Sequence, residues 1–337
     1  MTTEAVTLVP ERPVAVIITC YNEGAYIGAA VQSVLDQSRA DLIDCIVIAD
    51  DGSGPDTIAV LKTIECRDPR IRVIYGAGRA GISAQRNLAI RSTHAPILAI
   101  LDGDDLWRRD KLKRQLPALS DPTIGLVYAG YFTFTAEIRN AHRAVVRDIT
   151  SEPDLPRAFF LNDPPIIPSA ALIRRSAFEA CGGYDSSIPV FEDSDLHFRL
   201  ARVCRFAFVD APLLYKRNHA GSITGGRRKD LMAYHALVAL KAAADDARIL
   251  ALVPRRLAER ARKLGNHYFL MDDPARARPL LRFATQLDPR NLRAWGSLIV
   301  AVCFPRAVHL VMASRWRARR AALGVTDSVR KLSDAPK

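Results

Sequence analysis

The first 130 residues alternate between short, uninterrupted apolar runs and amphipathic stretches, and this alternation restricts the fold more than any other feature of the chain. Five apolar runs predict strands, at Val14–Thr19, Asp44–Ala49, Ile71–Tyr75, Ile97–Leu101 and Gly125–Tyr128. Between the first two runs, apolar residues recur at the spacing of one helix face. Strands that are apolar along their whole length are typical of a parallel sheet covered by helices on both faces. We therefore expect an α/β fold with a mostly parallel central sheet.

The rest of the chain predicts an extension of this domain and then a separate helical module. A strand is expected at Ile166–Ile173, and a helix at Ser194–Val203. From Lys229 onward, Ala, Leu and Arg dominate, and the apolar residues follow helical periodicity. The expected organisation is an N-terminal tail (1–12), an α/β domain (13–226), a basic helical module (227–325) and a flexible tail (326–337).

Positive charge is concentrated in the last third of the chain. The formal net charge is +12, and residues 227–337 hold 23 Lys and Arg against 9 Asp and Glu. Such a surface attracts phosphate groups, both those of nucleic acid and those of anionic lipid. We expect an anionic membrane surface as partner and no nucleic acid. A solvated arginine-rich helix face is the alternative. Six scattered cysteines without a CxxC pair, and an N-terminus without signal-peptide features, predict a cytoplasmic protein.

The most apolar part of the helical module runs from Leu298 to Ala313. Pro305, Arg306 and His309 interrupt it, whereas a segment that crosses a bilayer needs about 20 consecutive apolar residues. We expect this segment to lie in the membrane interface, which would make the protein peripheral on the cytoplasmic face of the inner membrane. Packing in the core of the helical module is the alternative.

Two clusters of carboxylates flank the second half of the predicted α/β domain. Asp102-Gly103-Asp104-Asp105 directly follows an apolar strand, and open α/β sheets bind ligands at the carboxyl ends of their strands. Neighbouring carboxylates repel one another unless a cation lies among them, and Mg²⁺ and Mn²⁺ take oxygen ligands and bridge to phosphates. We therefore predict a divalent metal and a phosphorylated substrate at this cluster. The second cluster, Glu192-Asp193-Ser194-Asp195, supplies a candidate base.

Three further segments place polar groups near the predicted sheet edge. The first strand ends in Thr19-Cys20-Tyr21-Asn22-Glu23, which offers contacts for a nucleotide base. The second ends in Asp50-Asp51-Gly52-Ser53. Gly81 to Asn87 opens a helix with Arg86 on its first turns, a combination that suits a diphosphate. Ser53 and Ser83 are suited to cap the helices beside them.

Taken in order, these segments resemble the family 2 glycosyltransferases, inverting enzymes of the GT-A fold that use nucleotide-diphosphate sugars. The resemblance covers about residues 13–225. It rests on five separated elements, which are Thr19-Cys-Tyr-Asn, Asp50-Asp-Gly-Ser53, Gly81 with Arg86-Asn87, Asp102-Gly-Asp-Asp105 and Glu192-Asp-Ser-Asp195. It implies that the donor, expected to be a UDP-sugar, is contacted by Thr19, Tyr21, Glu23, Asp50, Asp51, Arg86, Asp102 and Gly103.

The resemblance also implies individual roles for some of these residues. Asp102 should lie near the ribose and the metal, Asp104 should bind Mn²⁺ or Mg²⁺ directly, and Arg86 should face the diphosphate. Arg217 to Gly226 is similar to the family's mobile loop, with His219 as a further metal or phosphate contact, although a domain linker explains its glycines equally well. Asp193 should be the general base, with Glu192 as the competing assignment.

The implied reaction is a single in-line displacement at the anomeric carbon, in which the base takes the proton of an acceptor hydroxyl. The expected acceptor is a carbohydrate or a lipid-linked precursor of a surface polysaccharide. A noncatalytic scaffold, with a vestigial domain and a helical tail that binds partners, is the alternative. No G-x-G-x-x-G follows the first strand, so a Rossmann-type oxidoreductase or methyltransferase is not expected.

Overall fold

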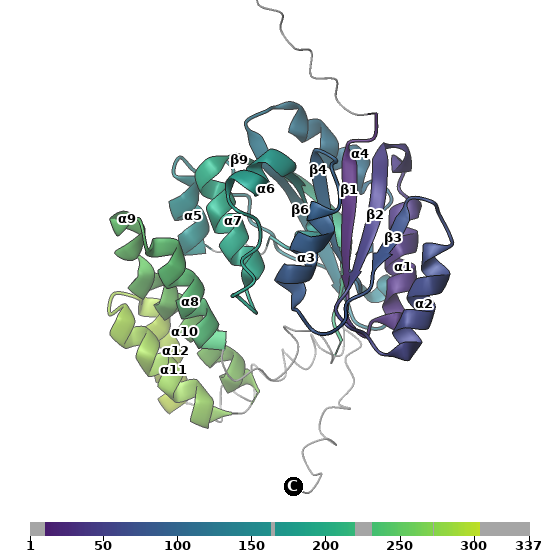
Figure 1. Cartoon of the computed structure of the whole chain (residues 1–337). Coiled ribbons are helices and arrows are strands. Elements are labelled where there is room, and N and C mark those ends of the chain that lie inside the picture. The colour runs from purple at the N-terminus through teal and green to yellow at the C-terminus, as the bar shows by residue number, and fades with distance from the viewer. Residues whose placement is uncertain (1–10, 163–165, 220–230, 272, 304–337) are drawn as a thin grey trace, which may run out of the picture. The chain divides into compact units, whose positions relative to one another are not determined.

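The computed structural model describes residues 11–162, 166–219, 231–271 and 273–303 (Figure 1). The chain separates into two units, each with its own internal contacts. Unit 1 comprises Met1–Thr133 and Arg143–Arg217, and unit 2 comprises Phe134–His142 and Asn218–Lys337. The domain boundary predicted between residues 226 and 227 lies outside the described residues.

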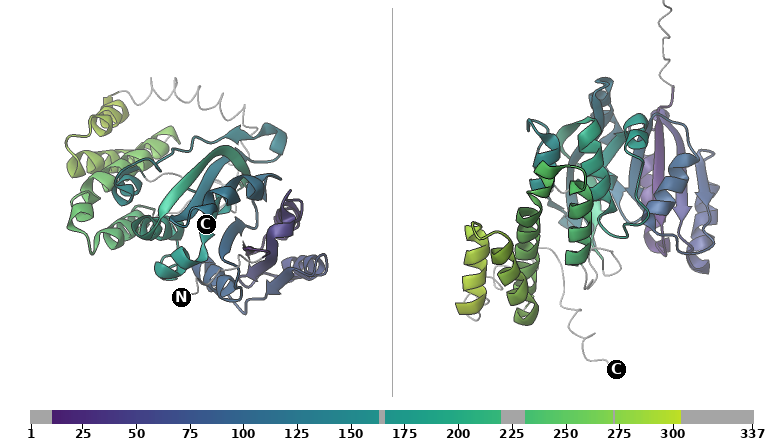
Figure 2. Two further views of the ribbon diagram at one scale, coloured as in Figure 1. Left: turned by 90° about the horizontal axis from the view of Figure 1, so that it is seen from above. Right: turned by 60° about the vertical axis from the view of Figure 1, so that its left-hand side comes forward.

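Unit 1 is built on a mixed sheet in which the strands follow the order β3-β2-β1-β4-β8-β6-β9-β5, and β7 pairs with β6. Strands β1 to β4 are parallel, whereas β8 runs antiparallel to both β4 and β6. The strands are β1 (Val14–Cys20), β2 (Ile43–Asp50), β3 (Ile71–Ile74), β4 (Ile97–Asp102), β5 (Leu106–Trp107), β6 (Ile124–Phe134), β7 (His142–Arg143), β8 (Ala171–Arg174) and β9 (Arg205–Arg217). Figure 2 shows the curl of this sheet from two further directions.

Helices cover both faces of the parallel strands, as the continuous apolar runs predict. Val14, Val16 and Ile18 of β1 pack in one cluster with residues of α1 and α2, and all three are fully buried. Each such side chain stabilises the fold by about 1.5–3 kcal/mol. The intervening residues of β1 are also buried, and α3 contacts β1 and β2. The helices of unit 1 are α1 (Gly24–Leu35), α2 (Pro55–Glu65), α3 (Ile82–Arg91), α4 (Lys111–Gln115), α5 (Leu155–Asn162), α6 (Arg175–Ala180) and α7 (Glu192–Val203).

Two segments of unit 1 differ from the sequence prediction. The strand expected at Ile166–Ile173 is a 3₁₀ turn at Pro168–Ala170 followed by β8, because proline fixes φ and has no N–H to donate to a ladder. The helix expected from Ser194 begins two residues earlier, so the second acidic cluster forms the first turn of α7. Acidic residues are favourable there because the helix dipole is positive at its N-terminus.

From Leu231 onward, the described part of unit 2 is helical, as predicted. Its helices are α8 (Leu231–Ala243), α9 (Ala247–Leu250), α10 (Val253–Leu270), α11 (Pro274–Leu287) and α12 (Leu292–Cys303). Helices α10 and α11 approach closely at Gly265, where an added Cβ would lie 2.8 Å from Leu281. None of the helices within the described residues is both long and apolar enough to cross a bilayer. The predicted interfacial segment lies partly on α12, and its remainder, from residue 304, is outside the described residues.

Candidate functional site

The carboxyl ends of β1, β2 and β4 form one rim, because the three strands end at nearly the same level. Thr19 pairs in register with Asp102, and Cys20 pairs with Asp50. The predicted donor-side residues at the ends of these strands therefore lie side by side. Ser169, in the turn before β8, supports this rim because its hydroxyl accepts a hydrogen bond of 3.0 Å from the Asp102 N–H.

Gly103 lets the chain turn tightly at this rim. Its N–H donates to the carbonyl of Thr19 at 3.1 Å. A Cβ at this position would lie 2.8 Å from the same carbonyl oxygen and closer still to the carboxylate of Glu23. Glycine is thus the residue that fits between the end of β1 and the start of α1.

Glu23 joins the aspartates of the first cluster. Burial, together with the charges of Asp104, Asp102 and Asp105, raises the pKa of Glu23 to about 9. Its Oε2 atom is buried and has no hydrogen-bond partner within the described residues. The pKa of Asp105 is likewise raised to about 8, first by burial. Burial and the neighbouring carboxylates thus favour the neutral form of both groups in the unliganded protein.

Two basic residues at the end of β9 face this acidic cluster. The Arg217 N–H donates to the carboxylate of Asp105 at 3.0 Å, and its Nε donates to the carbonyl of Asp104 at 3.0 Å. Burial works against the charge of Lys216, but the carboxylates of Asp105, Asp102 and Asp104 outweigh it and raise the Lys216 pKa. Lys216 was not among the predicted site residues. Its position directly before the glycine-rich segment that begins at Arg217 could have indicated it.

Arg86 connects the first acidic cluster to the second. Its Nη2 lies 2.6 Å from Asp102 Oδ1, and its Nη1 lies 2.9 Å from Glu192 Oε1. Only 1% of the side chain is exposed. This arginine was predicted to face a diphosphate, and in the structure it is the buried ion-pair partner of two carboxylates. The resemblance did not imply these pairs.

Asp193 lies beside Glu192 on the first turn of α7. Burial and the neighbouring charge of Glu192 raise the pKa of Asp193 to about 7. One of its carboxylate oxygens accepts a hydrogen bond from the Ser194 N–H at 2.7 Å. Phe191, which precedes the helix, adopts φ of 65°, a left-handed conformation that is strained for a bulky residue. Because Glu192 is engaged by Arg86, Asp193 is the carboxylate of this pair that is better suited to accept a proton.

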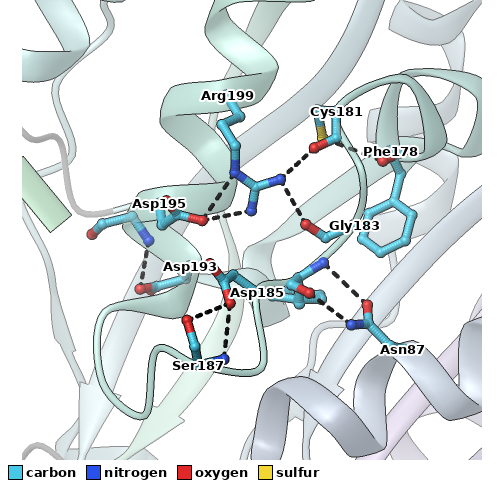
Figure 3. Close-up of polar contacts among 11 residues, drawn as sticks. Asn87, Phe178, Cys181, Gly183, Asp185, Ser187, Asp193, Asp195 and Arg199 are labelled. Carbon is cyan, nitrogen blue, oxygen red and sulfur yellow. Dashed lines mark hydrogen bonds and ion pairs between the residues drawn. The ribbon is translucent and has the colours of Figure 1, made fainter. Parts of the chain in front are cut away.

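A turn at Cys181–Tyr184 packs between α3 and α7, and Figure 3 shows how it is held. The side chain of Asn87 accepts a hydrogen bond from the Tyr184 N–H at 3.0 Å and donates to the Tyr184 carbonyl at 2.7 Å. From the other side, Arg199 donates to the carbonyls of Cys181 and Gly183 and pairs with Asp195 at 2.6 Å. Asn87 and Arg86 are neighbours on α3, so one helix contacts both this turn and the acidic clusters.

Asp50 and Asp51 both have local partners. Asp50 is fully buried, and its carboxylate accepts hydrogen bonds from the N–H groups of Gly52 and Ser53. Asp51 accepts from the N–H groups of Ala80 and Gly81, just before α3. The two carboxylates thus shape the turns around the rim, and their contact with a nucleoside stays a prediction.

The expected caps at Ser53 and Ser83 are wrong. Helix α2 has Gly54 as its N-cap residue, and Ser53 instead accepts a hydrogen bond from the Asn22 N–H at 2.8 Å. Helix α3 has Gly81 as its N-cap residue, and Ser83 is buried inside the first turn. In both places a glycine occupies the position that a serine was expected to fill.

Tyr21 is the most accessible of the predicted donor contacts on β1 and the loop after it. It is 36% exposed, and the guanidinium of Arg79 lies 4.2 Å from the centre of its ring. Thr19 is buried at the end of β1. An exposed aromatic ring beside a cation at this rim is a suitable surface for a nucleobase.

The residues of the first cluster fit a divalent metal of the magnesium or manganese type. Asp102 and Asp104 present carboxylate oxygens, which such ions prefer. Among the described residues, no three His, Cys, Asp or Glu side chains are arranged as a site complete in itself. Magnesium commonly uses one or two carboxylates together with substrate phosphates, so two aspartates suffice. His219, the third predicted ligand, follows β9 in unit 2, and its role stays a prediction.

The chain is similar to known glycosyltransferases. The model of the family "Glycosyl transferase family 2" matches residues 15–182. The teichuronic acid biosynthesis glycosyltransferase TuaG of Bacillus subtilis is 36% identical over 118 residues, which are 35% of this chain and 46% of that protein. The Escherichia coli UDP-Glc:alpha-D-GlcNAc-diphosphoundecaprenol beta-1,3-glucosyltransferase WfgD is 30% identical over 118 residues, 35% of this chain and 45% of that protein. The match thus spans less than half the length of these two relatives.

A solved structure extends the likeness of the fold. The crystal structure of S. aureus TarS 1-349 in complex with UDP-GlcNAc superposes with a TM-score of 0.60 at 15% identity, over 90% of this chain and 91% of that one. The predicted GT-A-type α/β fold is thereby confirmed. With the family model matched from β1 through α6, the chain belongs to glycosyl transferase family 2.

Proposed function

We propose that the protein is a metal-dependent inverting glycosyltransferase that moves a sugar from a UDP-sugar to a hydroxyl group of a carbohydrate or lipid-linked acceptor. One observation carries the proposal. Residues from the end of β4 and from the first turn of α7, which are about 90 positions apart in the sequence, meet at Arg86. The proposed donor carboxylate Asp102 and the turn that carries the proposed base Asp193 are thus linked through one residue. This link supports a displacement at the anomeric carbon, because such a reaction needs both groups in one site.

In the proposed reaction, Asp193 accepts the proton of the acceptor hydroxyl as that oxygen attacks the anomeric carbon. Its raised pKa makes it a stronger base than an ordinary aspartate at neutral pH. Asp102 and Asp104 would hold the metal, which when bound neutralises charge on the departing diphosphate. Lys216 and Arg217 add fixed positive charge on the same side. Tyr21 offers a face for the uracil ring.

The named relatives support the choice of donor and acceptor class. WfgD is described as a transferase that uses UDP-Glc and a diphosphoundecaprenol-linked acceptor, and the TarS structure holds UDP-GlcNAc. A panel of nucleotide sugars with Mn²⁺ or Mg²⁺ would test the proposal by measuring release of the nucleoside diphosphate. Turnover of one UDP-sugar in preference to GDP-sugars is the expected result. Binding of UDP without turnover of any sugar, with or without candidate acceptors, would favour the noncatalytic scaffold instead.

We further propose that unit 2 holds the enzyme on an anionic membrane surface, close to a lipid-linked acceptor. Helix α12 supports this proposal because four apolar side chains at helical spacing are exposed on it, namely Leu292, Trp295, Ile299 and Val302. Arg290 and Arg293 are exposed beside them. Apolar and basic residues together are what an interfacial helix requires. Leu298, by contrast, packs toward the cluster around Phe269, so the predicted interfacial segment contributes to the core as well.

Sedimentation with vesicles of anionic lipid would test the membrane proposal. Substituting serine for Leu292, Trp295 and Ile299 together should release the protein into the supernatant at low salt. The control is Leu250→Ser, which changes a leucine on α9 of the same unit that is as exposed as Ile299, at 51%. If the triple variant and the wild type sediment equally, α12 is not the contact surface. A chain that ends at residue 303 would then show whether the later residues bind the vesicles.

A further inference from the structure

Arg86 has a position in this structure that the proposed reaction does not yet explain. It is a fully buried arginine, and two different elements supply the carboxylates that it pairs with, β4 through Asp102 and α7 through Glu192. Both pairs are short, and both partners are largely buried, with 24% of the Asp102 side chain and 12% of the Glu192 side chain exposed. Breaking one pair leaves a buried charge without compensation, so the three groups keep one arrangement.

Tyr184 further restricts the guanidinium. Its ring centre lies 5.2 Å from the Arg86 Cζ, and the ring itself is only 3% exposed. The backbone of Tyr184 is in turn fixed by Asn87, the next residue on α3. The guanidinium is therefore held by an aromatic ring and by two carboxylates, and each of these belongs to a different segment of unit 1.

In this arrangement the guanidinium of Arg86 is not available to a diphosphate. The two terminal nitrogens already donate to carboxylates, and Nε is buried without a hydrogen-bond partner among the described residues. A guanidinium with 1% exposure has no surface left for a solvent-facing ligand. Lys216 and Arg217, in contrast, are only partly buried and lie beside the first acidic cluster.

We propose that Arg86 is a positioning residue that joins the two halves of the site. It holds Asp102 at the end of β4, and through Glu192 it holds the first turn of α7, which carries Asp193. Glu192 then acts by fixing that turn and not as the base. This inference rests on the proposed function, since it states which residue fixes the position of the proposed base relative to the proposed donor carboxylate.

A double-mutant cycle of Arg86→Met and Glu192→Gln tests the proposal. If Arg86 acts through Glu192, the two changes remove the same link, and their effects are not additive. We expect kcat to fall about 100-fold in Arg86→Met, since small misplacements of reacting groups have effects of that size. The double variant should have a kcat within about threefold of Arg86→Met alone. Arg86→Lys, which can reach one carboxylate at a time, should recover part of the loss.

Binding of UDP with Mn²⁺, measured by calorimetry, separates this role from a direct contact with the diphosphate. As a positioning residue, Arg86 should change the Kd for UDP less than about tenfold when it is replaced by Met, while kcat falls much further. An arginine that held the diphosphate itself would give the opposite pattern, with a large loss of UDP binding and additive effects with Glu192→Gln. That result would overturn the proposal.

Arg175→Met is the matched control for a merely structural effect. Arg175 is also an arginine that links segments of unit 1, with 14% of its side chain exposed. It donates to the carbonyls of Ala95 and Ile90 and to the hydroxyl of Thr93, and its ion pair with the exposed Glu179 on the same helix is longer, at 3.5 Å. It should lower the midpoint of urea unfolding as Arg86→Met does, while kcat and its pH profile stay close to those of the wild type. Equal kinetic losses in the two variants would mean that Arg86 acts only on stability, which contradicts the proposal.

The cycle can also be read without turnover. If no sugar nucleotide is turned over by the wild type, the proposed function fails, but urea unfolding of the same four proteins still measures the coupling between Arg86 and Glu192. A coupling in stability with UDP binding retained would support the link between the halves of the site independently of catalysis. Additive effects on unfolding would show that the link is absent and would overturn the inference.

Discussion

The pH dependence of the reaction should report the ionisation of Asp193, and replacing its neighbour Glu192 should move it. With a pKa of about 7, Asp193 is about half ionised at pH 7, about one tenth ionised at pH 6 and about nine tenths ionised at pH 8. A base must be ionised to accept a proton. Activity should therefore fall as the pH drops below 7, about tenfold per unit in the acid limb.

The structure indicates the size and sign of the change in Glu192→Gln. Burial is the main cause of the raised Asp193 pKa, and the charge of Glu192 adds to it. A single neighbouring charge commonly shifts a pKa by about 1 unit or more. Glu192→Gln should therefore move the acid limb about 1 unit toward lower pH, even if its plateau is lower than that of the wild type.

The assay is the initial rate of nucleoside diphosphate release between pH 5 and 9, with each profile scaled to its own plateau. Asp193→Asn should lose the acid limb together with about 10²–10⁴ of the rate, because it keeps the shape but removes the proton acceptor. If Asp193→Asn keeps an acid limb near pH 7, another group is the base. If the limb of Glu192→Gln stays in place, Glu192 does not influence the base as its position indicates.

Three further predictions concern the metal, the glycine of the first cluster and a buried lysine. EDTA should abolish sugar transfer, and Mn²⁺ or Mg²⁺ should restore it. Asp104→Ala should lower kcat at least several-hundred-fold, because charge on the leaving group is then poorly compensated. Full activity in EDTA would exclude the metal from the reaction. Gly103→Ala should destabilise unit 1 by about 1–3 kcal/mol in urea unfolding and weaken UDP binding, because the added Cβ would lie 2.8 Å from the Thr19 carbonyl oxygen. The control is Gly78→Ala, where no atom lies within 4 Å of the added Cβ, and it should change neither stability nor UDP binding. Lys111 is fully buried, and burial holds its pKa well below the usual value. The unfolded state therefore binds more protons than the folded state. The free energy of unfolding should rise with pH up to about pH 10.5, by at most about 1.4 kcal/mol per pH unit. Lys111→Met should remove this slope, and an unchanged slope between pH 7 and 9 would show that the lysine stays charged.

Local patterns in the sequence were sufficient for five of the strands and for the clustering of carboxylates, but not for β5, β7 and β9. Five predicted strands correspond to β1, β2, β3, β4 and β6, because strands buried on both faces need continuous apolar runs. Local patterns were insufficient where a distant partner decides. The burial of Arg86 depends on Asp102 and Glu192, and nothing near position 86 distinguishes a buried arginine from an exposed one.

The turns show the same limit. Serine is a common N-cap residue, but at α2 and α3 the N-cap residue is glycine, and the carboxylates of Asp50 and Asp51 satisfy the nearby N–H groups. Asp50 does so within its own turn, and Asp51 does so from the end of β2 to the segment before α3, so propensity alone misassigned the caps. The first turn of α7 was missed for a related reason. Three acidic residues within four positions are typical of a loop, and only the N-terminus of a helix makes them favourable in a helical turn.

Because β1, β2 and β4 end at nearly the same level, the two halves of the site should unfold at different stages. Amide hydrogens in central, fully paired strands exchange with solvent only when most of a domain unfolds, whereas those in a helix turn next to a strained residue exchange through smaller openings. Thr19, which pairs with Ala49 on one side and Asp102 on the other, belongs to the first group, and the turn at Asp193, which follows Phe191, belongs to the second. In mild denaturant, deuterium should therefore enter the first turn of α7 well before it enters the strand ends. Catalysis would disappear at a denaturant concentration at which the nucleotide still binds.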